Sequence, residues 1–485
     1  MSYLGIDIGT SSVKTVLFDR DQRLIGQASQ PLSVSRPHPG WSEQDPEAWW
    51  RAVEGTIDAL AREHGLGGLR GIGLSGQMHG AVCLDHDDQV LRPAILWNDG
   101  RAQAECAEIE AAFPRAREVA GNIAMPGFTA PKIAWLRKHE PEVYAKIDTV
   151  LLPKDYVRFR LTGHHVSEMS DAAGTYWLDV AARDWSDDLL EATGLTRAHM
   201  PRLVEGSEPS GELLPELARR WGIGGTVVVA GGAGDNAAAA CGMGVVVPGS
   251  AFVSIGTSGV LFVSNARFSP NTGGAVHAFC HAIPDTWHQM GVILSASDSL
   301  EWLARIAGKQ PAELAGAVGE VKAPSEVTFL PYLSGERTPL NDAAARGAFV
   351  GMAQTDGPRE LTQAVMEGVA YAFADCQRVL ADAGTDFASA LAVGGGARSE
   401  TWLRIIASVL DRPLEIAADS DVGAALGAAR LAICAADGAR PAEVCTAPEI
   451  LKVVEPDRSL VPLYREGYAR YRAVYPALKA VRAEA

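Results

Sequence analysis

The chain has 485 residues, 47% of them hydrophobic, which is enough for two or three domains with cores of their own. It carries 43 Lys and Arg residues against 59 Asp and Glu residues, a net charge of −16 at pH 7. Nucleic-acid phosphates and anionic membrane surfaces repel a protein of this charge, so we expect neither as a partner.

The seven cysteines are scattered along the chain without a C-x-x-C pair, which argues against a disulfide framework and against a cysteine-based zinc site. The N-terminus has no basic segment followed by an apolar one, and no apolar tract reaches the roughly 18 residues of a membrane span. We therefore expect a soluble cytoplasmic protein.

The chain opens with three predicted strands, at residues 3–8, 12–18 and 24–34, separated by turn-forming residues. A helix is predicted over Pro46–His64, because Asp45 can cap it, proline suits its first position and Gly65 can end it. Strands and helices then alternate, as in a mixed α/β domain. The predicted strands are 69–75, 81–84, 149–152 and 226–230, and the predicted helices are 131–139 and 213–221.

Near residue 245 the pattern restarts, with strands predicted at 250–255 and 260–264. Residues 8–11 and 255–258 share the sequence Ile-Gly-Thr-Ser, and each copy lies between two predicted strands. We infer a duplicated α/β architecture with domains at 1–244 and 245–485 and a central ligand cleft between them. The second half continues with a helix at 359–383, a strand at 390–393 and a helix at 399–410.

The two Gly-Thr-Ser segments are candidate phosphate turns. A triphosphate needs backbone N–H groups, which glycine lets it approach, and small hydroxyl side chains nearby. Thr10 and Ser11 supply these in the first copy, Gly256 and Thr257 in the second, and the carboxylate of Asp7 ends the strand before the first copy. Taken singly, either segment could be an ordinary hairpin turn.

A third glycine-rich segment, at residues 394–396, follows a predicted strand and precedes a predicted helix. Its bare backbone would let a nucleotide ring or a phosphate lie against Gly395, Gly396 and Ala397. The alternative is a tight strand-to-helix turn with no ligand.

Three other motifs are set aside. Residues 71–76 match G-x-G-x-x-G, but another apolar strand follows them instead of a helix. The P-loop and protein-kinase motifs are absent. A zinc site is disfavoured at a group of His and Cys residues that lacks a second Cys pair or a carboxylate: His277, Cys280, His281 and His288.

Asp235 is the strongest candidate for a catalytic group. It follows a buried strand and a Gly-rich bend, and it begins a helix of small residues. The alternative to catalysis is a plain N-cap, which aspartate forms well. In the functional interpretation the helix dipole keeps the carboxylate ionised, and Asp235 takes the proton of an attacking alcohol during phosphoryl transfer.

Two polar segments at the ends of apolar strands indicate a polyol ligand. Residues 77–80 contain Gln77 and His79, and residues 97–101 contain Trp97 and Asp99. Hydrogen-bonding groups beside a flat aromatic wall suit a sugar. Each of these residues, taken alone, could equally be structural.

The sequence resembles the FGGY carbohydrate kinases at four segments: 7–10 (DIGT), 127–136, 347–352 and 360–367. Further segments resemble the members of that family that act on D-xylulose: 35–39, 41–46, 76–80, 96–101, 152–156, 170–175 and 329–339. The resemblance spans nearly the whole chain and weakens after about residue 436. One departure is Ala233, in a bend where the family resemblance leads us to expect mainly glycine.

The resemblance implies two actin-like, ribonuclease-H-like domains that close over ATP and a sugar. It implies that Asp235 is the base and that Asp7 lies near Mg²⁺. The sugar-binding residues that we expect are Gln77, Met78, His79, Asp99 and Asn236. The nucleotide-binding residues that we expect are Thr10, Ser11, Gly256, Thr257, Gly395, Gly396 and Ala397.

The expected reaction is ATP-dependent phosphorylation of D-xylulose to xylulose 5-phosphate, with the sugar mainly on the first domain and ATP and Mg²⁺ mainly on the second. We also expect a homodimer. One alternative is a kinase of the same architecture that acts on ribulose or a glycerol-like polyol. The other is an actin-type assembly or binding protein that uses the same phosphate turns without phosphorylating a sugar.

Overall fold

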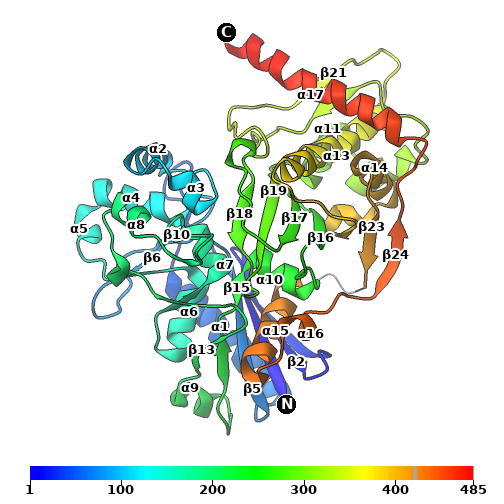
Figure 1. Ribbon diagram of the computed structural model, residues 1–485. Helices are drawn as coiled ribbons and strands as arrows, with labels where there is room; N and C mark the ends of the chain where they lie inside the picture. Colours follow the sequence, from blue (N-terminus) through cyan, green and yellow to red (C-terminus); the bar gives the residue numbers. More distant parts are fainter. Residues whose placement is uncertain (419–422, 484–485) are drawn as a thin grey trace.

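The computed structural model describes residues 1–418 and 423–483, and it contains two lobes, each built on a seven-stranded mixed sheet (Figure 1). The strand order of the N-terminal sheet is β13-β14-β5-β1-β2-β3, with β15 also paired to β5. Its strands are β1 (Ser2–Ile8), β2 (Ser12–Asp19), β3 (Leu24–Pro31), β5 (Leu69–Gly76), β13 (Pro209–Glu212), β14 (Val228–Ala230) and β15 (Ala233–Gly234).

The C-terminal sheet has the order β18-β19-β17-β16-β22-β23-β24. Its strands are β16 (Ala251–Ile255), β17 (Gly259–Asn265), β18 (His277–Cys280), β19 (Trp287–Ile293), β22 (Ala390–Val393), β23 (Leu414–Ala417) and β24 (Ile450–Val454). In each sheet the first strand pairs antiparallel with the next strand of a meander and parallel with a strand from much later in the chain. The duplicated, actin-like α/β architecture that the sequence predicts is therefore confirmed.

The helices of the N-terminal part are α1 (Pro46–His64), α2 (Gln103–Ala112), α3 (Ala116–Ala120), α4 (Thr129–His139), α5 (Pro141–Tyr144), α6 (Pro153–Thr162), α7 (Met169–Ala172), α8 (Asp187–Ala192), α9 (Pro215–Arg220) and α10 (Asp235–Gly242). The later helices are α11 (Ser297–Ala307), α12 (Pro311–Val318), α13 (Pro358–Asp382), α14 (Glu400–Leu410), α15 (Gly423–Asp437), α16 (Pro441–Val444) and α17 (Val461–Ala483). In the part of the chain that the structure describes, no helix is both long and apolar enough to cross a membrane.

Short strands pair outside the two main sheets. They are β4 (Glu43–Gln44) with β7 (Ala94–Ile95), β6 (Val82–Leu84) with β8 (Thr149–Leu151), β9 (Val166–Glu168) with β12 (Arg202–Val204), β10 (Leu178–Asp179) with β11 (Asp184–Trp185), and β20 (Thr328–Leu330) with β21 (Ala348–Val350). Two predicted strands, at residues 81–84 and 149–152, thus pair with each other and not with the central strands.

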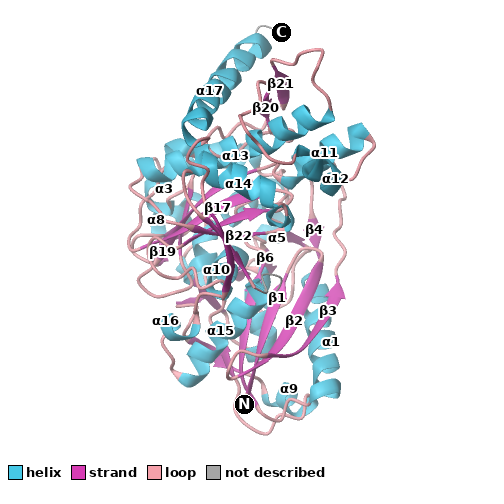
Figure 2. Ribbon diagram, turned by 90° about the vertical axis from the view of Figure 1, so that its right-hand side faces the viewer, coloured by secondary structure: helices cyan, strands magenta, loops and turns pink. Residues whose placement is uncertain are grey.

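Helix α1 follows its predicted bounds. The Asp45 side chain accepts a hydrogen bond from the Glu47 N–H, and Gly65 ends the helix with a positive φ of 68°. Its buried face packs against β2 and β3. Figure 2 shows β1, β2 and β3 between α1 on one side and α15 and α16 on the other.

Helix α15 lies far along the chain but packs against the N-terminal sheet. It contacts β1, β5, β14 and α10. Glycines make this close approach possible, because a Cβ atom at Gly5 would lie 1.9 Å from the Ala425 carbonyl oxygen, and one at Gly427 would lie 1.8 Å from the Ala238 carbonyl oxygen. The helix that begins at Asp235, α10, is thereby packed against a helix that lies about 190 residues later in the chain.

Candidate active site

Asp7 lies near the carboxyl end of β1, between β2 and β5. The Ser75 hydroxyl donates a hydrogen bond of 3.0 Å to Asp7 Oδ1. Burial raises the pKa of this carboxyl, and the Ser75 bond and the nearby Lys14 oppose the rise. The parallel pairing of β1 with β5 therefore places a partly buried carboxylate at the start of the first Gly-Thr turn.

The side chain of the partly buried Thr10 is held by protein partners. Its hydroxyl donates to Gln77 Oε1 and accepts from Trp97 Nε1, both at 3.0 Å. Gln44 Nε2 donates to the Thr10 carbonyl oxygen at 2.8 Å. Ser11, in contrast, is exposed, and its carbonyl oxygen accepts from the Leu32 N–H.

Asp235 is the first residue of α10, and the N-cap is Gly234. The Asn236 backbone N–H and side-chain Nδ2 donate to Asp235 Oδ1 at 2.7 and 2.9 Å. Burial, and then the charge of Asp7, raise the pKa of Asp235 to about 6. The sequence-based interpretation attributes the ionised state of Asp235 to the helix dipole, and burial and the second carboxylate act in the opposite direction. A carboxyl with this pKa is still ionised at pH 7 and binds protons better than a solvent-exposed one.

Buried polar groups form hydrogen bonds with the backbone of the bend before Asp235. Gly232 has φ +72°, and a Cβ atom there would lie 2.2 Å from the Leu74 carbonyl oxygen. The Gly234 N–H donates to the Ser170 hydroxyl at 3.1 Å, and Arg158 donates to the Gly231 carbonyl oxygen. A fully buried charged group lies beneath: Lys154, Asp155, Arg158, Glu168 and Asp171. The backbone that carries Asp235 is thus fixed from several sides.

His79 adopts a left-handed conformation with φ +70°. Its Nδ1 donates to the Gly174 carbonyl oxygen at 2.6 Å, since that oxygen can only accept. Burial, and then the charge of Lys132, lower the pKa of His79 to about 3, so the ring is neutral and Nε2 carries a lone pair. Lys132 Nζ also donates to the His79 carbonyl oxygen at 2.8 Å.

Met78 joins His79 to the bend that carries Asp235. A Cβ atom at Gly234 would lie 2.9 Å from Met78 Cγ, and one at Gly174 would lie 2.6 Å from the His79 ring. The structure therefore brings Met78, His79 and Asp235 together, as the sequence predicts, and two glycines leave the space for them.

Asp99 and Gln77, two of the expected sugar-binding residues, form several hydrogen bonds with other protein groups. The Asp99 carboxylate accepts from Arg101 Nε and Nη2 at 2.9 and 2.7 Å, and from the Ser42 N–H at 2.6 Å. Both ends of the Gln77 amide are engaged, with Thr10 and with Gln44. The structure gives these two residues protein partners that would support the wall of a sugar site.

The second Gly-Thr turn and the glycine-rich segment meet in the C-terminal lobe. A Cβ atom at Gly394 would lie 2.8 Å from the Ile255 carbonyl oxygen, and one at Gly396 would lie 2.3 Å from Ile255 Cγ2. This proximity follows from the parallel pairing of β16 with β22. Thr257 is exposed, and its carbonyl oxygen accepts from the Ala296 N–H at 2.8 Å.

A pocket of about 530 Å³ opens beside the glycine-rich segment. Its wall comes from α11, α12, α14 and the residues before α14. The lining residues are Ser297, Leu300, Glu301, Pro311, Ala312, Ala315, Gly316, Gly395, Gly396, Arg398, Ser399, Glu400, Thr401 and Trp402. An apolar wall with bare backbone on one side suits a nucleotide base.

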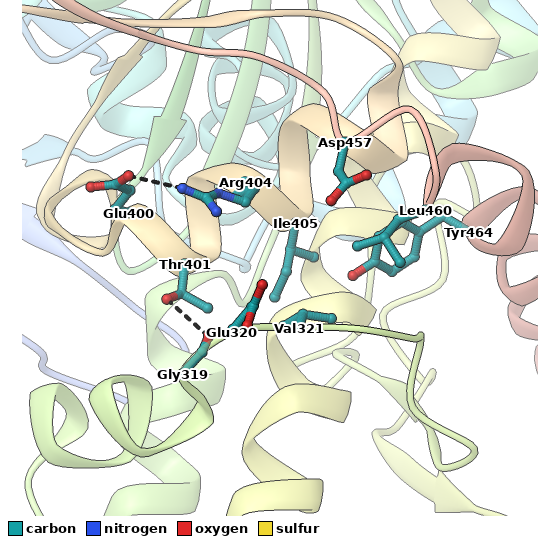
Figure 3. A pocket seen from close by; sticks show the side chains of 10 residues that line it. All are labelled: Gly319, Glu320, Val321, Glu400, Thr401, Arg404, Ile405, Asp457, Leu460 and Tyr464. Carbon is teal, nitrogen blue, oxygen red and sulfur yellow. Dashed lines mark hydrogen bonds and ion pairs between the residues drawn. The ribbon is translucent and has the colours of Figure 1, made fainter.

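A second pocket, of about 310 Å³, lies against α14 and the residues that lead into α17 (Figure 3). Charged side chains line it, among them Glu320, Arg404 and Asp457, and Arg404 pairs with Glu400 at 3.1 Å. It contains none of the predicted site residues.

The donor set around Asp7 fits a magnesium ion held together with a nucleotide. Mg²⁺ commonly binds one or two carboxylates and takes its other ligands from phosphates and water. Asp7 and Asp235 lie close enough for the charge of one to raise the pKa of the other. Within residues 1–418 and 423–483, no group of three or more His, Cys, Asp or Glu side chains could hold a metal ion by itself.

Three polar residues near the site were not given a role by the sequence: Ser170, Lys132 and Arg337. Ser170 and Lys132 contact the backbone of the Asp235 bend and of His79. Arg337 Nη1 donates to His277 Nε2 at 3.3 Å, and its charge acts on His79. All three lie within segments that carry the family resemblance, but their contacts join parts of the chain far apart in sequence.

Residues 2–242 match the N-terminal domain, and residues 251–436 the C-terminal domain, of the FGGY family of carbohydrate kinases. A xylulose kinase of Escherichia coli strain K12 is 52% identical over 437 residues, which are 90% of each chain. A xylulose kinase of Bacillus subtilis strain 168 is 36% identical over 99% of each chain. Among solved structures, a xyloylose kinase from Brucella ovis superposes with a TM-score of 0.97 at 55% identity, covering 99% of this chain and 100% of that one.

Proposed function

The chain belongs to the FGGY family of carbohydrate kinases, and from this premise we propose that it transfers the γ-phosphoryl group of ATP to the terminal hydroxyl of D-xylulose. The substrate is supported by relatives named xylulose kinase that match about nine tenths of the chain or more. The mechanism is supported by one observation above all: a carboxyl with a pKa of about 6 belongs to the residue that follows Gly234, the glycine of the bend that lies against Met78.

In the proposed reaction, Asp235 accepts the proton of the sugar hydroxyl as the hydroxyl oxygen bonds to the γ-phosphorus. The bond from that phosphorus to the β–γ bridging oxygen breaks, and ADP leaves. Asn236 donates two hydrogen bonds to Asp235 Oδ1, which leaves Oδ2 as the oxygen available to the sugar. His79 Nε2, with its lone pair, accepts a hydrogen bond from another hydroxyl of the sugar.

We propose that the nucleotide binds mainly to the C-terminal lobe. The adenine lies in the pocket lined by Gly395 and Gly396, with Ala397 next to them along the chain and packed against the core, and the phosphates reach the turn at Gly256 and Thr257. Thr10 and Ser11 face the phosphates from the other lobe. Closure of the two lobes excludes water, which would otherwise compete with the sugar for the γ-phosphoryl group.

We propose Mg²⁺ as the metal and Asp7 as the residue that holds it, directly or through water. When bound, a divalent ion neutralises the charge of the phosphate oxygens. Asp7 is suited to this role because burial makes its negative charge costly without a cation beside it.

Three further parts of the proposal concern the whole chain. The division at residues 244 and 245 assigns the sugar to the first domain and the nucleotide to the second. A cytoplasmic location is supported by the seven cysteines, all buried free thiols. The homodimer stays a prediction, which the molar mass in solution would test.

The test of the proposed function is ATP consumption by the purified protein with D-xylulose, D-ribulose, glycerol or no sugar. We expect ADP and sugar phosphate in equal amounts, with the highest kcat/KM for xylulose. A higher kcat/KM for ribulose or glycerol would contradict the substrate assignment. ATP consumption that is equal without any sugar would instead favour the actin-type alternative.

A further inference from the structure

Arg337 is a half-buried arginine that the proposed mechanism does not use. Among the residues that the structure describes, no carboxylate forms an ion pair with its guanidinium. The neighbouring Glu336 does not neutralise it, since burial raises the pKa of Glu336 to about 8 and the carboxyl is mostly protonated at pH 7. An unpaired guanidinium at such a depth is costly unless a ligand supplies acceptors.

A chain of hydrogen bonds with a defined direction holds the Arg337 side chain. Asn122 Nδ2 donates to the carbonyl oxygens of Ala120 and Ala278, at 2.8 and 3.0 Å, so Asn122 Oδ1 must accept. His277 Nδ1 donates to that oxygen at 2.9 Å, which leaves His277 Nε2 as the acceptor of the bond from Arg337 Nη1. One guanidinium N–H is thereby used, and the rest of the planar group is oriented.

The backbone of Arg337 is also fixed. Thr338 exchanges hydrogen bonds with Val292 of β19, donating from its N–H and accepting at its hydroxyl, both at 3.0 Å. Glu336 Oε1 accepts from the Arg337 N–H at 2.7 Å and from the Leu294 N–H at 3.0 Å. Arg337 therefore extends from a rigid segment of the C-terminal lobe.

The guanidinium lies close enough to the sugar side of the site to act on two imidazoles there. Its charge helps to lower the pKa of His79 and the pKa of His277, and His79 also acts on His277. The Phe128 ring contacts both imidazoles, with its centroid 4.8 Å from that of His79 and 5.8 Å from that of His277. The Arg337 guanidinium, which can only donate hydrogen bonds, and His79 Nε2, which can only accept them, thus lie near the same aromatic ring.

We propose that Arg337 is a specificity-determining residue whose free N–H groups donate to the C2 carbonyl oxygen of the ketose, while His79 Nε2 accepts from a hydroxyl. This inference rests on the proposed function, because only a ketose presents a carbonyl there. A guanidinium has donors and no acceptor, which matches a carbonyl oxygen better than a hydroxyl. A site built around such a bond discriminates strongly against the analogue that lacks the acceptor.

The experiment compares Arg337→Met with the wild type and with Arg346→Met, an exposed arginine of the same lobe, as the control. It measures the KM for xylulose, the KM for ATP and the inhibition constant of xylitol, which has a hydroxyl in place of the carbonyl. We expect Arg337→Met to raise the xylulose KM about tenfold to a hundredfold, the range for a hydrogen bond to a charged group. The ATP KM and the xylitol constant should change less than threefold, and Arg346→Met should match the wild type.

Two further variants test the assignment if Arg337→Met does not fold. Arg337→Lys keeps the charge but loses the planar fork, and we expect it to recover part of the xylulose affinity. His277→Phe removes the acceptor that orients Arg337, and we expect a smaller rise in the xylulose KM, of about three- to tenfold, again without an equal effect on xylitol.

A xylulose KM within twofold of the wild type in Arg337→Met, or in Arg337→Lys if only that variant folds, would overturn the inference. Equal losses for xylulose and xylitol would overturn the carbonyl assignment. If the wild type itself does not phosphorylate xylulose, the proposed function fails, which is a different outcome.

Discussion

The two Gly-Thr-Ser turns have the same sequence and the same place in their sheets, yet their surroundings differ. Thr10 has its hydroxyl bonded to Gln77 and Trp97 and its carbonyl oxygen bonded to Gln44. Thr257 has an exposed side chain, and only its backbone is tied, to the loop before α11. The Thr10 hydroxyl is therefore bonded to protein groups, while the Thr257 hydroxyl has no hydrogen-bond partner among the described residues and, in our proposal, contacts the nucleotide.

The difference teaches that duplication sets the path of the backbone but not the role of each side chain. Both turns join the first two strands of a meander, because both sheets start in the same way. The two turns differ in the segments that pack against them. Gln44, Gln77 and Trp97 contact the first turn, and the glycine-rich segment after β22 lies beside the second. Mutations at the two threonines should separate these roles.

The largest expected effect comes from the second turn. Thr257→Val removes a hydroxyl that we propose contacts the phosphates, and kcat/KM for ATP should fall about a hundredfold, the scale for one lost donor at a site of developing charge. Because the side chain is exposed, the melting temperature should hardly change. Steady-state kinetics with ATP varied would check this, with Ser258→Ala as the control. A loss confined to the xylulose KM would contradict the assignment.

The second largest effect is the pH dependence of kcat/KM for xylulose, which we attribute to Asp235 in the lobe of the first turn. Asp235, with its raised pKa, must be ionised to act as a base, so kcat/KM for xylulose should fall below about pH 6 and be about tenfold lower at pH 5 than at pH 7. Thr257→Val should leave this acid limb in place, since Asp235 and Asp7 both lie in the N-terminal lobe. A profile that stays flat to pH 5 would show that another group is the base.

The smallest effect on catalysis is expected at the first turn. Thr10→Val breaks two hydrogen bonds with protein partners and should lower the free energy of unfolding by about 1 to 3 kcal/mol. The xylulose KM should rise severalfold, because Gln77 and Trp97 lose a partner, while the ATP KM changes less than in Thr257→Val. Chemical denaturation and a sugar titration would measure both. A larger loss for ATP than for xylulose would mean that the two turns act alike.

Much of the fold could be predicted from the sequence, because its signals are local. The bounds of α1 follow from Asp45, Pro46 and Gly65, and the duplication follows from a repeated tetrapeptide. The packing of α15 onto the N-terminal sheet could not be predicted, since it depends on contacts between residues about 420 apart, such as Gly5 and Ala425.

The candidate site also has a part that the sequence predicts and a part that it does not. Asp235, Met78 and His79 stand in recognisable local patterns, and the structure brings them together. The raised pKa of Asp235 depends on Asp7, at the other end of the lobe's sequence, and the orientation of Arg337 depends on Asn122. Such properties arise from burial and from distant partners, which no local pattern records.

The most direct test of the account is the turnover of Asp235→Asn with xylulose and ATP at pH 8. Folding raises the pKa of Asp235 from 3.8 to about 6, so the ionised carboxylate is less favourable in the folded protein than in the unfolded chain. Asp235 therefore lowers the free energy of unfolding above pH 6, and this loss disappears as the pH falls below 4. The variant should therefore be at least as stable as the wild type at pH 8, with an advantage of up to roughly 3 kcal/mol that shrinks as the pH falls from 6 to 4. We expect kcat to fall at least about a hundredfold while xylulose still binds. A folded variant that turns over at a near-normal rate would contradict the central claim that this carboxylate takes the proton of the sugar.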